Sequence, residues 1–148
     1  MSYNPTFAGV SVAPSSKTVQ TSEINTSGGT LLKLTPVRID ASGNMATIDV
    51  AVESQAFAVA GILSTSVADS SSGDIINSGR ISNITTTAGF GDVLYVSKTG
   101  GITSIKPTIG LDSFVIDDFV IRLGVVAKNP INPSNKDLLV NISIVGQL

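Results

Sequence analysis

One short run in the sequence matches a known catalytic motif: Lys98-Thr99-Gly100. In β-lactamases and penicillin-binding proteins, a Lys-Thr-Gly run works with a serine nucleophile that comes from a Ser-x-x-Lys motif. The chain contains no Ser-x-x-Lys run, and a Ser-Tyr-Asn run like the companion element stands at residues 2–4. We therefore interpret residues 99–101 as a hairpin turn whose two glycines supply positive φ angles. Lys98 is expected to be a solvated residue at a strand end.

A second candidate for chemistry is the acidic pair Asp117 and Asp118. Adjacent residues on a strand point to opposite faces, so these two carboxylates cannot flank one substrate bond. We interpret them as a turn or bulge before a long strand. The chain has no histidine and no cysteine, which removes the commonest general base, the thiol nucleophile and the commonest transition-metal ligands. The sequence therefore predicts no catalytic, metal-binding or cofactor-binding residues.

Composition narrows the range of partners. The chain has 148 residues, the size of one domain, and charged residues make up 14% of it, against about 25% in typical proteins. The net charge is −2 and the basic residues are scattered singly, which argues against nucleic acid as a partner. No apolar run approaches about 18 residues and the N-terminal residues lack a signal-peptide pattern. We expect a chain made in the cytoplasm, not exported, and without a membrane partner.

Alternating apolar and polar residues predict antiparallel strands near the C-terminus. A loop over 129–137, with two prolines, is expected to join residues 119–128 to residues 138–148. The predicted core faces consist of Phe119, Ile121, Leu123, Val125 and Ala127 in the first segment and of Leu138, Val140, Ile142 and Ile144 in the second.

The middle of the chain also indicates strands. Residues 37–39 and 46–52 flank an Asp-Ala-Ser-Gly-Asn turn and predict a hairpin. Residues 56–63 are apolar on both faces, which favours a central strand over a short buried helix. Two segments that begin with Gly-Asp, 73–84 and 91–105, share the order of apolar run, glycine turn and second run, so each predicts a two-stranded unit. Any helix is expected to be a single turn, near 64–69.

Together these patterns predict an all-β fold, either an antiparallel β-sandwich or a small jelly-roll-like β-barrel. The segments "VAGIL" and "RLGVV" each place a glycine before an apolar pair, which supports repeated hairpins. Residues 1–30 are rich in Ser, Thr, Asn and Gly and predict an extended polar arm, with a frayed terminus as the alternative. Residues 31–148 are expected to form a single all-β domain.

The runs "GDVLYVSKTGGIT", "IRLGVVAK" and "DLLVNISIVGQL" resemble bacteriophage capsid decoration, or cement, proteins of tailed-phage heads. The resemblance covers about residues 34–148. It implies a structural virion protein on the outer capsid surface, a homotrimer that clamps neighbouring major capsid proteins. With this partner, Tyr3 and Phe7 of the arm are the candidate capsid contacts.

Three other functions remain as alternatives. A phage fibre or tail-attachment module would also be structural and would bind tails. A glycan-binding β-sandwich usually stacks sugars on aromatic faces, and this chain has no tryptophan and two tyrosines. An enzyme would depend on Lys98 or on the paired aspartates.

Overall fold

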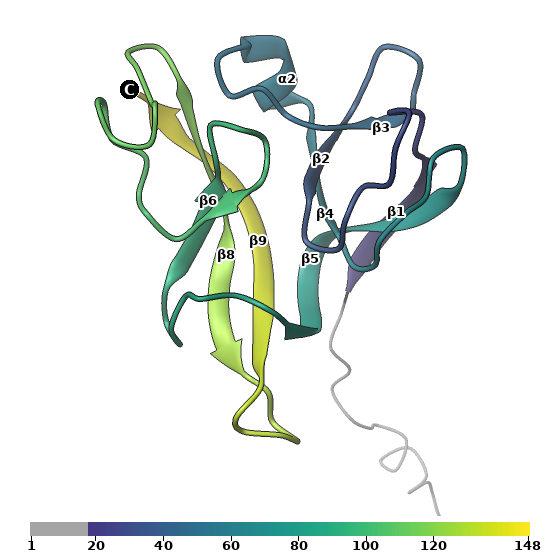
Figure 1. Ribbon diagram of the computed structural model, residues 1–148, viewed down its shortest axis with the longest axis vertical. Coiled ribbons are helices and arrows are strands. Elements are labelled where there is room, and N and C mark those ends of the chain that lie inside the picture. Colours follow the sequence, from purple (N-terminus) through teal and green to yellow (C-terminus); the bar gives the residue numbers. More distant parts are fainter. Residues whose placement is uncertain (1–17) are drawn as a thin grey trace, which may run out of the picture.

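Nine antiparallel strands and one helical turn make up residues 18–148, the part of the chain that the computed structural model describes (Figure 1). The sheet does not close on itself, so the all-β antiparallel prediction is confirmed without a closed barrel. The elements are β1 (Val19–Ile24), β2 (Pro36–Ile39), β3 (Met45–Ala46), α2 (Glu53–Phe57), β4 (Val59–Leu63), β5 (Ser72–Ile84), β6 (Val93–Val96), β7 (Ile102–Thr103), β8 (Phe119–Lys128) and β9 (Lys136–Gln147).

The long strand β5 joins the two halves of the sheet. The strand order is β3-β2-β4-β5-β9-β8-β6-β7, with β1 also paired to β5. Residues 72–78 of β5 pair with β1, whereas residues 78–84 pair with β9. Gly79 lies at this change of partner with a φ of +130°, and a Cβ there would come within 3 Å of Thr18. The two-stranded unit predicted for 73–84 is therefore wrong, because one continuous strand passes through the Asn-Ser-Gly run.

The main hydrophobic core lies between the two halves of the sheet. It collects buried side chains from β4, β5, β6, β8 and β9, together with Phe114 from the loop before β8. A smaller core surrounds Val37, Met45 and Leu63 and includes Leu31 and Val67 from the flanking loops. Strands β4 and β5 contribute side chains to both cores. Each Å² of apolar surface that they bury stabilises the fold by about 25 cal/mol, so this strand pair is the centre of the fold.

The two C-terminal strands agree with their predicted pattern until a bulge changes it. Strand β9 buries Leu138 and Val140 in the main core as predicted, and the 129–135 loop joins it to β8. In β8 the register against β6 shifts between Arg122 and Gly124, where β8 has one residue more than β6. After this bulge Val126 enters the core, and Val125 is only half-buried. A β-bulge adds one residue to a strand and therefore reverses the alternation of faces.

Some of the other local predictions are confirmed, and some are wrong. The 40–44 turn between β2 and β3 is confirmed, with the Asp40 carboxylate accepting from the Ser42 and Asn44 N–H groups. The strand predicted over 46–52 is wrong beyond residue 46, because β3 covers only Met45–Ala46. The 91–105 unit is the confirmed hairpin of β6 and β7. Of the strand predicted over 56–63, residues 59–63 form β4, whereas residues 56 and 57 belong to α2. The single helical turn, however, is α2 at 53–57, so its expected position near 64–69 was wrong.

Part of the predicted arm belongs to the sheet. Residues 19–24 form β1, which pairs antiparallel with β5. Most side chains of β1 are exposed, which explains why its sequence shows little hydrophobic pattern.

Candidate functional site

The tip of the β6–β7 hairpin contains the run that matched a catalytic motif. Ser97 N–H donates to the Gly101 carbonyl at 2.9 Å, and Gly100 N–H donates to the Ser97 carbonyl at 3.0 Å. Gly100 has a φ of +87°, whereas Gly101 does not have a positive φ. The predicted turn is confirmed, but only its first glycine needs the left-handed conformation.

Lys98 is not the solvated residue that the sequence predicted. Its Nζ lies 2.7 Å from both carboxylate oxygens of Asp118, and Asp118 is only 1% exposed. The same carboxylate accepts from the Val115 N–H at 2.8 Å. Asp118 thus ends the turn before β8 as expected, while its side chain ties this turn to the β6–β7 hairpin. Lys98 lies against Asp118 and not in solvent because a buried carboxylate needs a charged partner.

Lys98 lines a hollow of about 410 Å³, together with Ser97, Thr99, Ile102, Thr103, Asp112, Ser113 and Phe114. A serine nucleophile needs a base within hydrogen-bond reach. The Ser97 hydroxyl instead contacts Thr99 Oγ1 at 3.1 Å and accepts from the Gly101 N–H. Lys98 donates to Asp118, so the geometry supports a structural ion pair.

Replacing Lys98 with methionine is expected to reduce the free energy of unfolding by about 2–3 kcal/mol, because Asp118 would keep its burial and lose its charged partner. Urea unfolding measures this loss. Lys106→Met, at an exposed lysine, is the control and should change little. The double substitution Lys98→Met with Asp118→Asn should recover part of the loss. Equal stability of Lys98→Met and the wild type would contradict the structural role.

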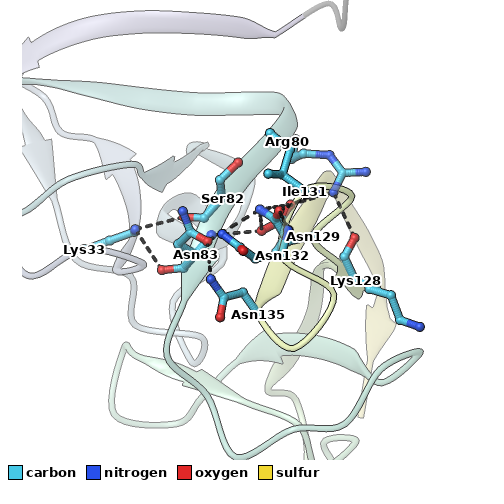
Figure 2. Close-up of polar contacts among 10 residues, drawn as sticks. Lys33, Arg80, Ser82, Asn83, Lys128, Asn129, Ile131, Asn132 and Asn135 are labelled. Atoms are coloured by element: carbon cyan, nitrogen blue, oxygen red, sulfur yellow. Dashed lines mark hydrogen bonds and ion pairs between the residues drawn. The ribbon is translucent and has the colours of Figure 1, made fainter.

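A larger polar network lies at the other end of β9 (Figure 2). The Asp137 carboxylate is fully buried. It accepts from Arg80 Nη1 at 2.6 Å, from the Asn83 N–H at 2.9 Å and from Asn129 Nδ2 at 3.0 Å. The donors come from β5 and from the loop after β8, so one carboxylate connects three segments that are distant in the sequence.

Burial alone would raise the pKa of the Asp137 carboxyl, since it disfavours the charged form. The N–H of Asn83, the Asn129 amide and the Arg80 guanidinium outweigh this effect and lower the pKa below the usual 3.8. Asp137 is therefore held as a carboxylate at neutral pH. Its charge is compensated by Arg80, whose side chain is about one third exposed.

Backbone geometry at Asn83 completes the network. Asn83 has a φ of +56°, a conformation that asparagine tolerates better than most residues. Its carbonyl and that of Ser82 accept from Lys33 Nζ, and its Oδ1 accepts from Asn135 Nδ2 at 3.0 Å. The Asn83 contacts thus fasten both the loop before β2 and the loop after β8 to the end of β5 (Figure 2).

Sequence reasoning did not find this network. The "NPINPSNKD" run indicates a loop, and neither Arg80 nor Asp137 stands in a recognisable motif. The one available signal was the density of Asn residues beside prolines, which form Asx turns. Tyr3 and Phe7, the candidate capsid contacts, lie outside the residues that the structure describes, so their role stays a prediction.

Residues 18–148 form an open, nine-stranded β protein with two ion pairs in which the carboxylate is buried and the cation is partly exposed. A comparison with protein-family models, curated proteins and solved structures found no significant match. Within residues 18–148, no three acidic residues gather at a point where they could hold a metal ion. No helix in the same part of the chain has the length and apolar character needed to cross a membrane.

Proposed function

We propose that this chain is a structural virion protein that binds the outer surface of a phage capsid and stabilises the shell. It acts there as a homotrimer that clamps neighbouring major capsid proteins, after synthesis in the host cytoplasm. The proposal assigns it no catalytic role, cofactor, nucleic acid or membrane partner. Its first support is the resemblance of residues 34–148 to capsid decoration proteins.

The observation that carries the proposal is an exposed apolar surface at one end of the sheet. Phe57 of α2 is 60% exposed and Ile116 is 67% exposed, with Val115 beside it. The Phe57 ring packs edge-on against Phe119, with the ring centroids 5.5 Å apart, so α2 adjoins the 115–118 turn. Figure 1 draws α2 and the C-terminal end of β9 at the same end of the molecule. We name this the α2 surface: Phe57, Val115 and Ile116.

Grouped apolar side chains on a surface mark contacts with other proteins. We assign the α2 surface to contact between copies. A trimer that binds the expanded shell, and not the precursor, stabilises the expanded form by linkage. Three weak sites on one trimer also act together.

The test is co-sedimentation of the purified protein with empty, expanded heads of its own phage, together with its mass in solution. We expect a mass of three chains and stable binding to heads. Ile116→Asp should lower the mass towards that of one chain, because it places a charge in the contact between copies. Urea unfolding of the variant checks that the fold is intact, which the exposure of Ile116 leads us to expect.

Other outcomes point elsewhere. A wild-type protein that is a monomer and fails to sediment with heads would rule out the decoration function. Association with purified tails and not with heads would favour the fibre or tail-attachment alternative. An unchanged trimer in Ile116→Asp would remove the α2 surface from the contact between copies.

A further inference from the structure

The loop between β8 and β9, residues 129–135, carries the most exposed large apolar side chain of residues 18–148. Ile131 is 85% exposed. The other loop residues are asparagine, proline and serine, so the loop carries no charge of its own. A single exposed isoleucine is ordinary on a protein surface. Ile131 differs because hydrogen bonds hold the backbone of its loop in place.

The backbone of this loop is fixed by its own hydrogen bonds. Asn129 Oδ1 accepts from the N–H groups of both Ile131 and Asn132 at 2.9 Å. The Asn129 N–H donates to the Asn135 carbonyl at 3.0 Å, and the Asn135 N–H donates to the Asn132 carbonyl at 2.9 Å. Pro130 and Pro133 restrict φ at two further positions. The loop backbone at Ile131 is therefore held in place, and binding through this residue requires little loss of backbone entropy.

The base of the loop is anchored in the Asp137 network. Asn129 is buried and donates to Asp137, while Asn135 donates to Asn83 on β5. Figure 2 shows these side chains meeting between β5 and the loop. The exposed tip thus stands on a buried, charge-compensated base.

The surroundings of the loop are basic. Lys128 is exposed, and its Nζ lies 5.7 Å from the centre of the Phe90 ring, which is itself half exposed. Arg80 reaches the Lys128 carbonyl as well as Asp137. The basic side chains whose contacts place them around the base of the loop are Lys33, Arg80, Lys128 and Lys136, and the acidic ones are Asp92 and the buried Asp137. An apolar tip with a basic rim is complementary to an apolar pocket with an acidic rim.

We propose that the 129–135 loop is the element that contacts the capsid shell, with Ile131 entering an apolar pocket whose rim is acidic. This inference rests on the proposed decoration function and names the contact that the function requires. Buried apolar anchors at the centre of an interface contribute most of its binding energy. The basic rim accelerates association with the acidic partner, and salt weakens this effect.

The position of the loop favours the shell over a second copy as its partner. Strand β9 has 12 residues and therefore spans about 35 Å. The loop precedes its first residue, whereas Leu148, just after its last, pairs with Asp117 and Asp118 of the 115–118 turn. The loop and the α2 surface thus lie at opposite ends of β9. Copies that meet through the α2 surface leave the loops free to face the shell.

The experiment compares head binding of the full chain and of Ile131→Asp, with purified, expanded heads of its own phage as the probe. We expect the variant to bind roughly 10-fold or more weakly, as for a central anchor. Ile105→Asp is the matched control, because Ile105 is an exposed isoleucine on another loop. It should bind like the wild type. Lys128→Glu should also weaken binding and reduce its dependence on salt. Mass and urea unfolding should be unchanged in all three variants.

The outcomes separate this inference from the proposed function. If the wild type and Ile131→Asp bind heads equally, the shell contact lies elsewhere and this inference fails while decoration stands. An equal loss in Ile131→Asp and Ile105→Asp also overturns it, since any added acidic charge would then suffice. A wild-type protein that binds no heads overturns both.

Discussion

Asp137→Ala is expected to lower the free energy of unfolding by about 3–5 kcal/mol, the usual effect of breaking a buried ion pair from one side. The alanine leaves the Arg80 guanidinium without its carboxylate. It also leaves the Asn83 N–H and the Asn129 amide without the acceptor that they share. Buried donors that lose their partners keep the full cost of their desolvation. The change therefore costs more than any one of the lost hydrogen bonds.

Urea unfolding at neutral pH measures this effect. Glu53→Ala is the control, because Glu53 is an exposed acidic residue in the first turn of α2 and its removal should change stability by less than about 0.5 kcal/mol. Asp137→Asn should lie between the two, since the amide keeps the size of the side chain and one acceptor oxygen. Equal midpoints for Asp137→Ala and Glu53→Ala would show that the network does not hold the end of β5 to the loop.

The same carboxylate predicts the direction of the pH dependence. The folded pKa of Asp137 lies below its usual value of 3.8, so the folded state binds its proton less readily than the unfolded state. The contribution of Asp137 to stability is therefore fully present above about pH 4–5 and is lost as the pH falls through the folded pKa. Asp137→Asn should accordingly show a shallower loss of stability below pH 4 than the wild type.

The sequence predicts those strands whose burial follows a period of two. Strand β9 keeps this period from Leu138 onward, and its buried face was predicted correctly. Strand β8 follows the prediction only as far as its bulge, because a bulge has no signature in hydrophobic alternation. Strand β5 was divided in two because Asn-Ser-Gly at 77–79 is a typical turn sequence. In the structure Gly79 instead allows the strand to approach Thr18 while it changes partners.

The candidate site was largely beyond sequence reasoning. The ion pair of Lys98 with Asp118 joins residues 20 positions apart, and that of Arg80 with Asp137 joins residues 57 positions apart. Which charges meet depends on the strand order, and β5 pairs with β9 across a long separation in sequence. What could be predicted was the local chemistry of the turns, such as the glycine at position 100 and the loop between β8 and β9.

Gly124→Ala is expected to destabilise the protein by about 3 kcal/mol or more, at the upper end of the usual cost of overpacking. An added Cβ would stand well inside van der Waals contact of the Leu139 carbonyl oxygen on β9, and within 3.2 Å of a Leu138 methyl group. The obstacle is backbone in a paired strand, so it cannot move aside as a flexible side chain would. Relief requires β8 and β9 to separate where Gly124 pairs with Val140.

The matched control is Gly146→Ala, on the partner strand β9. A Cβ at Gly146 would meet no atom within 4 Å, so this change should be neutral or slightly stabilising, because alanine restricts the unfolded chain more than glycine does. Thermal or urea unfolding of both variants provides the comparison. Equal stability of the two would show that β8 and β9 can separate at Gly124 without cost.

Gly61 extends the argument to the other half of the sheet. A Cβ there would likewise stand inside contact distance of a carbonyl oxygen, that of Ile76 on β5, so Gly61→Ala should resemble Gly124→Ala. These are the two glycines that precede apolar pairs in "VAGIL" and "RLGVV". The shared pattern marks a shared requirement, the close approach of a neighbouring strand at a register shift in each half of the sheet. If only Gly124→Ala destabilised the protein, the two positions would not be equivalent and the echo in the sequence would have no structural meaning.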